Sequence, residues 1–121
     1  MIRLAIQAGV VSQDGRGPIG RFYAGAPGHV NKPDDCALVG LGPLPVGVYQ
    51  MGPPIDDPDV GQFAIPLTQI QGNTYNRSAF LWHGDNASKA PESSSRGCPI
   101  SPRSVREIGA ADPDQLLTVT P

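Results

Sequence analysis

Residues 78–103, SAFLWHGDNASKAPESSSRGCPISPR, form the segment on which the expected fold depends. The apolar run Ser78–Trp82 is typical of a strand, and it leads directly into His83. A polar loop, Asn86–Ser94, follows, and the chain then reaches Cys98. The segment therefore predicts a strand and a loop long enough to fold over a cleft. It also places a histidine and a cysteine on either side of that loop.

One helix is predicted after the cysteine. Ser101 is a suitable N-cap, Pro102 suits the first helical position, and Gly109 can close the helix. Residues three apart on a helix share a face, which predicts a short amphipathic element. Its apolar face would carry Val105 and Ile108, and its other sides would carry Arg103 and Arg106.

Outside this segment, short apolar runs alternate with turns. The 15 glycines and 14 prolines of the chain are scattered through its 121 residues, so they mark turns rather than a linker. Frequent turns with few helical runs favour a mainly β domain, and the length suits a single domain over residues 1–121. Strands are expected at 2–7, 21–24, 48–51, 62–65 and 116–120, with a turn cluster at 12–18 and Pro66 ending the 62–65 strand or lying at an edge.

Charge and hydropathy argue against several classes of protein. The formal net charge is −2, and the sequence has no basic cluster with interleaved aromatics. It therefore does not predict a nucleic-acid-binding surface. No apolar run approaches the roughly 20 residues of a transmembrane helix, so no membrane insertion is expected. Residues 1–11 carry one positive charge and are interrupted by Gln7, which favours a first strand over a secretory signal.

The candidate reactive groups are a thiol and an imidazole. A free thiol is only a few per cent thiolate at neutral pH, so the Cys98 sulfur needs a base or a cationic neighbour. His83 suits this task, and a nearby imidazolium would lower the pKa of the thiol. Gly84 lacks a Cβ, so its carbonyl can approach and orient the imidazole. Gly97 allows a sharp turn before Cys98 that aims backbone N–H groups at a developing oxyanion. The pattern predicts a cysteine nucleophile.

Three structural alternatives stay open. Cys36 and Cys98 could form a disulfide, although we expect two free thiols with Cys36 a small buried residue. His29, Cys36, His83 and Cys98 make a Cys₂His₂ set, but they lack the close pairwise spacing of structural zinc sites. The acidic stretch Asp56–Asp59 is expected to be a solvated loop, because a calcium site needs a fuller ligand pattern.

The motifs within residues 80–103, Phe-Leu-Trp-His-Gly-Asp and Ser-Arg-Gly-Cys-Pro-Ile-Ser-Pro-Arg, resemble the active-site signature of the L,D-transpeptidase family. That signature is a His-Gly pair, a variable loop and then Ser/Thr-His-Gly-Cys. The stretch Gly42–Tyr49 resembles the family's Pro-x-Gly-x-Tyr segment. With Tyr23–Gly25, the set is most similar to compact type VI secretion effectors that attack peptidoglycan. Arg96 stands where the wider family has histidine, which leaves His83 as the base.

The resemblance implies a mainly β fold, an L,D-transpeptidase-like β-sandwich or barrel with one short helix after Cys98. It implies that Cys98 attacks the carbonyl of the third residue of a peptidoglycan tetrapeptide stem and expels the terminal D-amino acid. His83 would act as base and then acid, oriented by the carbonyl of Gly84. No cofactor and no metal are implied. The residues expected near the substrate are Tyr23, Trp82, Asp85, Ser95, Arg96, Gly97 and Arg103.

The resemblance also implies a setting for this chemistry. The acyl-enzyme would pass to water, to a free D-amino acid or to a side-chain amine, giving L,D-carboxypeptidase, exchange or cross-linking activity. The protein would be secreted without a signal peptide and would act in the periplasm of a target bacterium, with an immunity protein protecting its producer. Two rival functions remain: a cysteine peptidase or amidase acting on another bond, and a non-catalytic wall-binding module.

Overall fold

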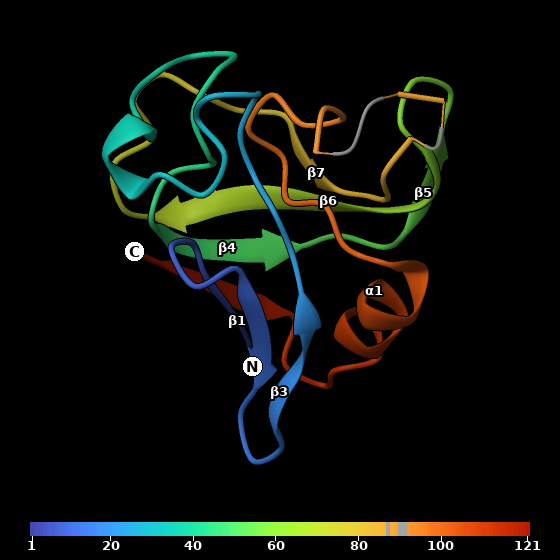
Figure 1. Ribbon diagram of the computed structural model, residues 1–121. Coiled ribbons are helices and arrows are strands. Elements are labelled where there is room, and N and C mark those ends of the chain that lie inside the picture. Colours follow the sequence, from blue (N-terminus) through green and yellow to red (C-terminus); the bar gives the residue numbers. More distant parts are fainter. Residues whose placement is uncertain (87, 90–91) are drawn as a thin grey trace.

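The computed structural model describes residues 1–86, 88–89 and 92–121. Strands and one α-helix make up its regular structure, together with a short 3₁₀ turn (Figure 1). The elements in chain order are β1 (Ile2–Ala5), β2 (Val10–Gln13), β3 (Gly17–Arg21), η1 (Pro33–Asp35), β4 (Gly47–Met51), β5 (Ile55–Asp57), β6 (Gly61–Gln71), β7 (Phe80–Trp82), α1 (Arg103–Ala110) and β8 (Leu116–Thr120).

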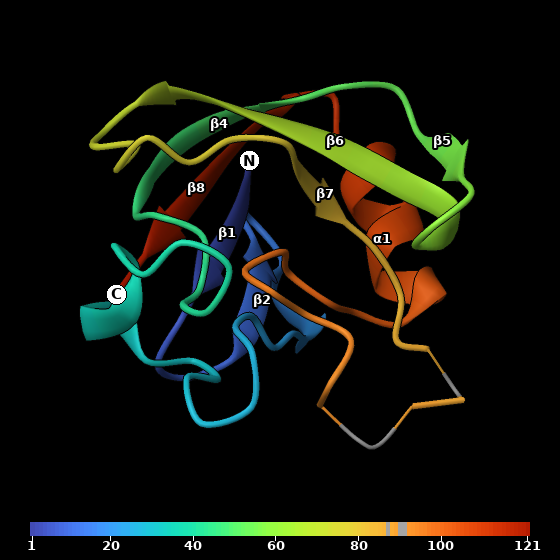
Figure 2. The same cartoon turned by 90° about the horizontal axis from the view of Figure 1, so that it is seen from above.

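The strands join into one 8-stranded sheet, in the order β3-β2-β1-β8-β4-β6-β5, with β7 paired to β6. Only the central β1–β8 pair is parallel among these described strands. The sheet is strongly bent, and α1 lies beside β6 at one end of it (Figure 2). The expectation of a mainly β fold with one short helix after Cys98 is confirmed.

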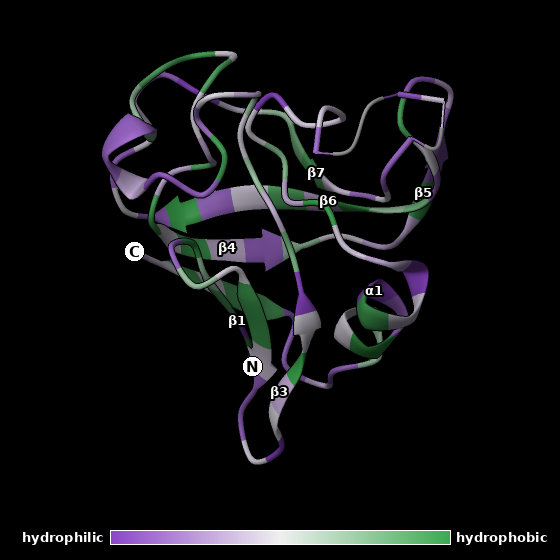
Figure 3. Ribbon diagram, viewed as in Figure 1, coloured by the Kyte–Doolittle hydropathy of each residue, from purple (hydrophilic) through white to green (hydrophobic). Residues whose placement is uncertain are grey.

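The core lies where the alternating apolar side chains of the central strands meet. Ile2 and Leu4 of β1 and Leu117 and Val119 of β8 are at most 1 % exposed. The apolar residues of β1 stand out in Figure 3. Burying one such aliphatic side chain contributes about 1.5–3 kcal/mol, so the parallel pair anchors the sheet. Trp82, at the end of β7, is fully buried in the same cluster.

One turn prediction and one strand prediction need correction. The expected turn at 12–18 is shorter, because Ser12 and Gln13 belong to β2 and Gly17 and Pro18 to β3. The strand expected at 21–24 gives way to β3, which ends at Arg21. Tyr23 makes only an isolated bridge, to Ile100.

Pro66 neither ends a strand nor lies on a bare edge. It stands inside β6, opposite Leu81 of β7. The β4 pairing of β6 reaches only to Leu67, and the β5 pairing begins at Ala64. The Pro66 carbonyl accepts from the N–H of Gly52, just beyond β4, at 2.8 Å, so the nitrogen of Pro66 faces that side too, where the β4 pairing has ended and no N–H is required.

The helix forms where expected, but with different ends. Its N-cap is Pro102 without a side-chain bond, because the Ser101 hydroxyl accepts from Trp82 Nε1 at 3.0 Å and donates to the Arg21 carbonyl at 2.9 Å. Gly109 lies inside the helix, where an added Cβ would come within 2.5 Å of the Trp82 ring. None of the described helices is both long and apolar enough to cross a membrane.

Candidate active site

Three distant segments run side by side at the candidate site. His83, just after β7, bridges in parallel to Ile100, and Ile100 bridges in antiparallel to Tyr23. The backbone N–H of His83 donates to the Pro99 carbonyl at 3.1 Å, and the N–H of Ser101 donates to the His83 carbonyl at 3.0 Å. The pairing fixes His83 beside the chain that leaves Cys98.

His83 and Cys98 line one cavity of about 880 Å³. The turn between β5 and β6, around Asp59, forms part of its wall. Arg96 and Asp85, both exposed, also line it. The structure thus brings the predicted nucleophile and the predicted base to the same open space.

The His83 ring is held by its neighbour in the chain. Its Nδ1 lies 2.8 Å from the carbonyl oxygen of Gly84, and because a carbonyl only accepts, Nδ1 carries the proton and Nε2 keeps its lone pair. Burial lowers the pKa of His83 below its usual 6.5; the Gly84 bond opposes this shift, and the charge of Arg106 adds to it. His83 is therefore a neutral imidazole with Nε2 ready to take a proton.

The Cys98 sulfur is half-buried and free of any disulfide. It accepts a hydrogen bond from the backbone N–H of Leu81 at 3.4 Å. Burial raises the pKa of this thiol above its usual 9.0, and the Leu81 bond and the charge of Arg77 offset only part of that shift. Burial thus favours the uncharged form of both groups, whereas the sequence analysis expected an imidazolium to lower the pKa of the thiol.

Ser95 and Gly97 shape the turn before the cysteine. The Ser95 hydroxyl donates to the Cys98 carbonyl at 2.7 Å and accepts from the N–H groups of Gly25 at 2.9 Å and Gly97 at 3.0 Å. Gly97 has φ 135°, a region that side chains rarely adopt. The sharp turn predicted at Gly97 is confirmed, and the Ser95 hydroxyl is occupied in holding it.

Arg77, which the sequence analysis did not identify, holds that turn in place through hydrogen bonds to backbone carbonyls. Its side chain is 7 % exposed. Nη1 donates to the carbonyls of Cys36 and Pro43, both at 2.7 Å, and Nη2 donates to those of Gly42 at 2.9 Å and Arg96 at 3.4 Å. The guanidinium carbon also lies 5.2 Å from the centroid of the neighbouring Phe80 ring. Arg77 thereby ties the loop before β4 to the turn that carries Cys98.

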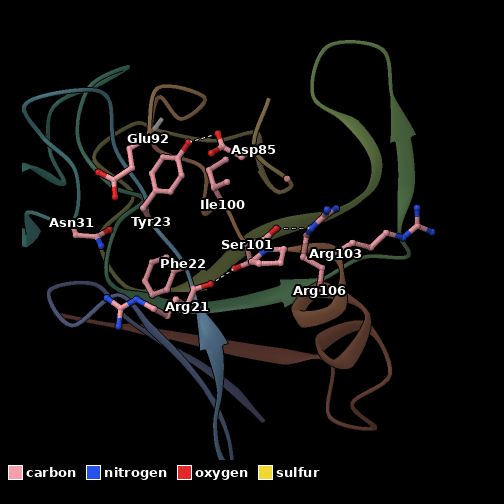
Figure 4. Close-up of a pocket in the computed structure, with 12 residues that line it drawn as sticks. Arg21, Phe22, Tyr23, Asn31, Asp85, Glu92, Ile100, Ser101, Arg103 and Arg106 are labelled. Carbon is pink, nitrogen blue, oxygen red and sulfur yellow. Dashed lines mark hydrogen bonds between the residues drawn. The ribbon is translucent and has the colours of Figure 1, made fainter. Parts of the chain in front are cut away.

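A second cavity, of about 470 Å³, lies next to the first and shares Gly84 and Asp85 with it. Figure 4 shows its lining, which includes Tyr23 and Arg103. The Tyr23 hydroxyl donates to Asp85 at 2.7 Å and accepts from the N–H of Ser94 at 3.1 Å. Two residues predicted to contact substrate, Tyr23 and Arg103, thus line this second cavity rather than the one that holds the cysteine.

The expected substrate contact of Trp82 needs correction. Its side chain has no exposed surface, since the ring packs against α1 and its Nε1 donates to Ser101. Gly97 is buried too, and its N–H is taken by Ser95. Arg96, Asp85 and Ser95 are the predicted contacts that line the cavity of the cysteine.

The structure also bears on the disulfide and zinc-site alternatives for the cysteines and histidines. Cys36 is buried and free, as expected. His29 Nδ1 lies 2.9 Å from an Asp35 carboxylate oxygen. Over residues 1–86, 88–89 and 92–121, no three His, Cys, Asp or Glu side chains are placed to hold a metal ion. The prediction that the loop Asn86–Ser94 folds over the cleft falls partly on residues 87, 90 and 91, outside the described residues.

The cavity combines a thiol, a neutral imidazole with one ring nitrogen held, and the polar side chains of Asp85 and Arg96. Such a set suits attack by sulfur on a carbonyl carbon, with the imidazole moving the proton. Set against models of known protein families, curated proteins and solved structures, the chain matches none of them.

Proposed function

We propose that the protein is a cysteine-dependent enzyme that acts on peptidoglycan tetrapeptide stems as an L,D-carboxypeptidase or an L,D-transpeptidase that exchanges D-amino acids. The observation that carries this proposal is the shared cavity of Cys98 and His83, with the imidazole held by the Gly84 carbonyl. The substrate class comes from the sequence resemblance, which also suggests an L,D-transpeptidase-like arrangement of the sheet and a role as a type VI secretion effector.

In the first step, the Cys98 sulfur attacks the carbonyl carbon of the third stem residue. Nε2 of His83 takes the thiol proton as the C–S bond forms, and His83 then gives that proton to the nitrogen of the departing D-amino acid. The C–N bond breaks, leaving a thioester on Cys98. The N–H of Leu81, already directed at the sulfur, stabilises the thiolate character that develops during the attack.

In the second step, a new nucleophile opens the thioester. Water loses a proton to His83 and adds to the carbonyl, and the Cys98 thiol leaves with that proton, releasing a tripeptide carboxylate. A D-amino acid can attack in the same way through its amine, which restores a tetrapeptide. The lowered pKa of His83 and the raised pKa of Cys98 fit this route, in which proton transfer accompanies attack rather than preceding it.

The test is digestion of purified tetrapeptide muropeptides followed by mass spectrometry. Wild type should release the terminal D-alanine or exchange it for an added D-amino acid. Cys98→Ala and His83→Ala should lose this activity by about 10³-fold or more. Cys36→Ala, which removes the other free cysteine, should keep it. Equal turnover in wild type and Cys98→Ala would overturn the proposal.

The same experiment distinguishes the rival functions. Cleavage at another bond, dependent on Cys98, would identify a peptidase or amidase of different specificity. Binding to sacculi that persists in Cys98→Ala, without product from wild type, would identify a wall-binding module. The effector role has its own test: directed to the periplasm of a Gram-negative host, wild type should lyse cells, whereas Cys98→Ala, or wild type kept in the cytoplasm, should not.

A further inference from the structure

Arg106 is a buried arginine behind the candidate base. It belongs to α1 and is only 5 % exposed. The sequence placed it on a side of the helix other than that of Val105 and Ile108, and the structure shows that this side is buried as well. Its Nε donates to the Ser101 carbonyl at 3.1 Å, as the dashed line in Figure 4 shows, and its Nη1 donates to the carbonyls of Gln62 at 3.0 Å and Phe63 at 2.5 Å.

These bonds join α1 to the segment that follows Cys98 and to the start of β6. Ser101 follows the cysteine segment and pairs with the backbone of His83. Phe63 lies at the start of β6 with φ 55°, a strained conformation that its bond to Arg106 helps to hold. Because these acceptors are neutral carbonyls, the bonds leave the positive charge of Arg106 without a counterion among them.

The third nitrogen of the guanidinium lies against Gly84. A Cβ built on Gly84 would come within 2.7 Å of Arg106 Nη2. Gly84 is therefore a glycine for a reason that the sequence did not show: the guanidinium occupies the space of a side chain. The peptide whose carbonyl holds the His83 ring thus rests directly on a buried cation.

We propose that Arg106 is a positioning residue for His83. It fixes the His83–Gly84 turn from behind, and its buried charge disfavours a second charge on the imidazole. A general base needs both effects: one orientation for the ring, and a lone pair that stays free at working pH. The catalytic part of this role rests on the proposed function, whereas the effect on the ring does not.

Other charges also act on the imidazole. Asp57 of β5 and Asp85, next to Gly84, favour its protonated form. Asp59, Lys89 and Arg96 line the same cavity from the remaining sides. Arg106 opposes the two carboxylates, and together with burial it keeps the pKa of His83 below 6.5. Arg103, three residues earlier on α1, is half-exposed and lies over the Phe63 ring, 4.9 Å from its centroid.

The experiment is an NMR titration of the imidazoles, which needs no substrate. The chain has two histidines, so a His29→Gln background leaves the His83 ring as the single signal. The variants are Arg106→Gln, which removes the charge, Arg106→Lys, which keeps the charge but loses the planar fork, and Arg103→Gln as the matched control. The readouts are the pKa of His83 and the ¹⁵N shifts that report which ring nitrogen carries the proton.

Arg106→Gln should raise the pKa of His83, and by more than Arg103→Gln does. Arg106→Lys should keep the pKa low but reduce the share of the Nδ1–H form. An unchanged pKa in folded Arg106→Gln overturns the inference. If Arg106→Gln does not fold, the test depends on Arg106→Lys. An unchanged share of the Nδ1–H tautomer in that variant would overturn the inference. A shift found in a protein without muropeptide activity would refute the proposed function but leave the role of Arg106 intact.

Discussion

The Nδ1–H of His83 donates to the carbonyl oxygen of Gly84, the next residue in the chain, at 2.8 Å. Because burial also lowers the pKa of His83, the ring is neutral over most of the physiological range. We therefore expect kcat/KM for a tetrapeptide muropeptide to rise with pH through a pKa below 6.5 and then to stay level until the Cys98 thiol ionises above 9.0. A profile that falls as the imidazolium loses its proton would instead indicate a preformed thiolate–imidazolium pair.

The reactivity of the thiol gives a second test of this protonation state. In a Cys36→Ala background, the rate of alkylation of Cys98 by iodoacetamide should be low at neutral pH. It should rise about tenfold per pH unit up to and beyond pH 9, because the pKa of Cys98 is raised by burial. His83→Ala should change this rate little at neutral pH. Fast alkylation at neutral pH that depends on His83 would show that the pair is charged at rest.

Gly97 should tolerate no side chain. An added Cβ would come within 2.3 Å of Arg77 Nη2, at a φ of 135°. Backbone strain and overpacking each cost about 1–3 kcal/mol, so Gly97→Ala should lower the free energy of unfolding by about 2–6 kcal/mol. Urea unfolding checks this. The control is Gly28→Ala, at φ 87° with open space around its Cβ, where only the strain applies. Equal losses in both variants would mean that contact with Arg77 is unimportant.

Arg77 should be a major determinant of stability. Arg77→Met leaves the buried carbonyls of Cys36, Gly42 and Pro43 without their donor. An unsatisfied buried polar group costs about 1–3 kcal/mol, so the expected loss is about 3 kcal/mol or more. Arg16→Met, in the exposed turn before β3, should change stability by about 0.5 kcal/mol or less. Thermal and urea unfolding of both variants measure the difference. A similar small loss of stability at both positions would contradict this role of Arg77.

Acidification should weaken the fold through His83. The pKa of this group is lower in the folded protein than the 6.5 expected for the unfolded chain. Between the two values the unfolded chain binds more protons, so the free energy of unfolding must fall as pH drops below 6.5. In His83→Gln this part of the pH dependence should disappear, as urea unfolding over mildly acidic pH would show. An identical slope in both proteins would place the titrating group elsewhere.

The sequence predicted local features well, but it did not predict the two buried arginines that support the site. The strands near 48–51 and 116–120, the helix after Cys98 and the turn at Gly97 follow from short-range patterns, and all of them form. The burial of Arg77 and Arg106 was missed because arginine is rarely buried. Their acceptors are also backbone carbonyls, 41 residues away for Cys36 and 43 for Phe63, and no pattern in the chain marks such carbonyls as partners.

Ser101 and Trp82 show why local rules failed at the helix start. A serine before a proline is a strong N-cap signal, yet its hydroxyl is claimed by the indole N–H of Trp82 from a strand 19 residues away. A buried indole needs an acceptor, and the Ser101 hydroxyl serves as that acceptor. The same packing explains why Trp82 supports the site from inside the core instead of facing a substrate.

The place of β8 in the sheet has a consequence for biosynthesis. This strand, at residues 116–120, lies between β1 and β4 and joins the two halves of the sheet. Until the ribosome has added these residues, β1 and β4 have no strand between them. The non-local pairing of β8 with these two strands therefore cannot form. Synthesis must therefore pass residue 120 before the two halves can pair through β8, so a chain released before that point should lack the closed sheet.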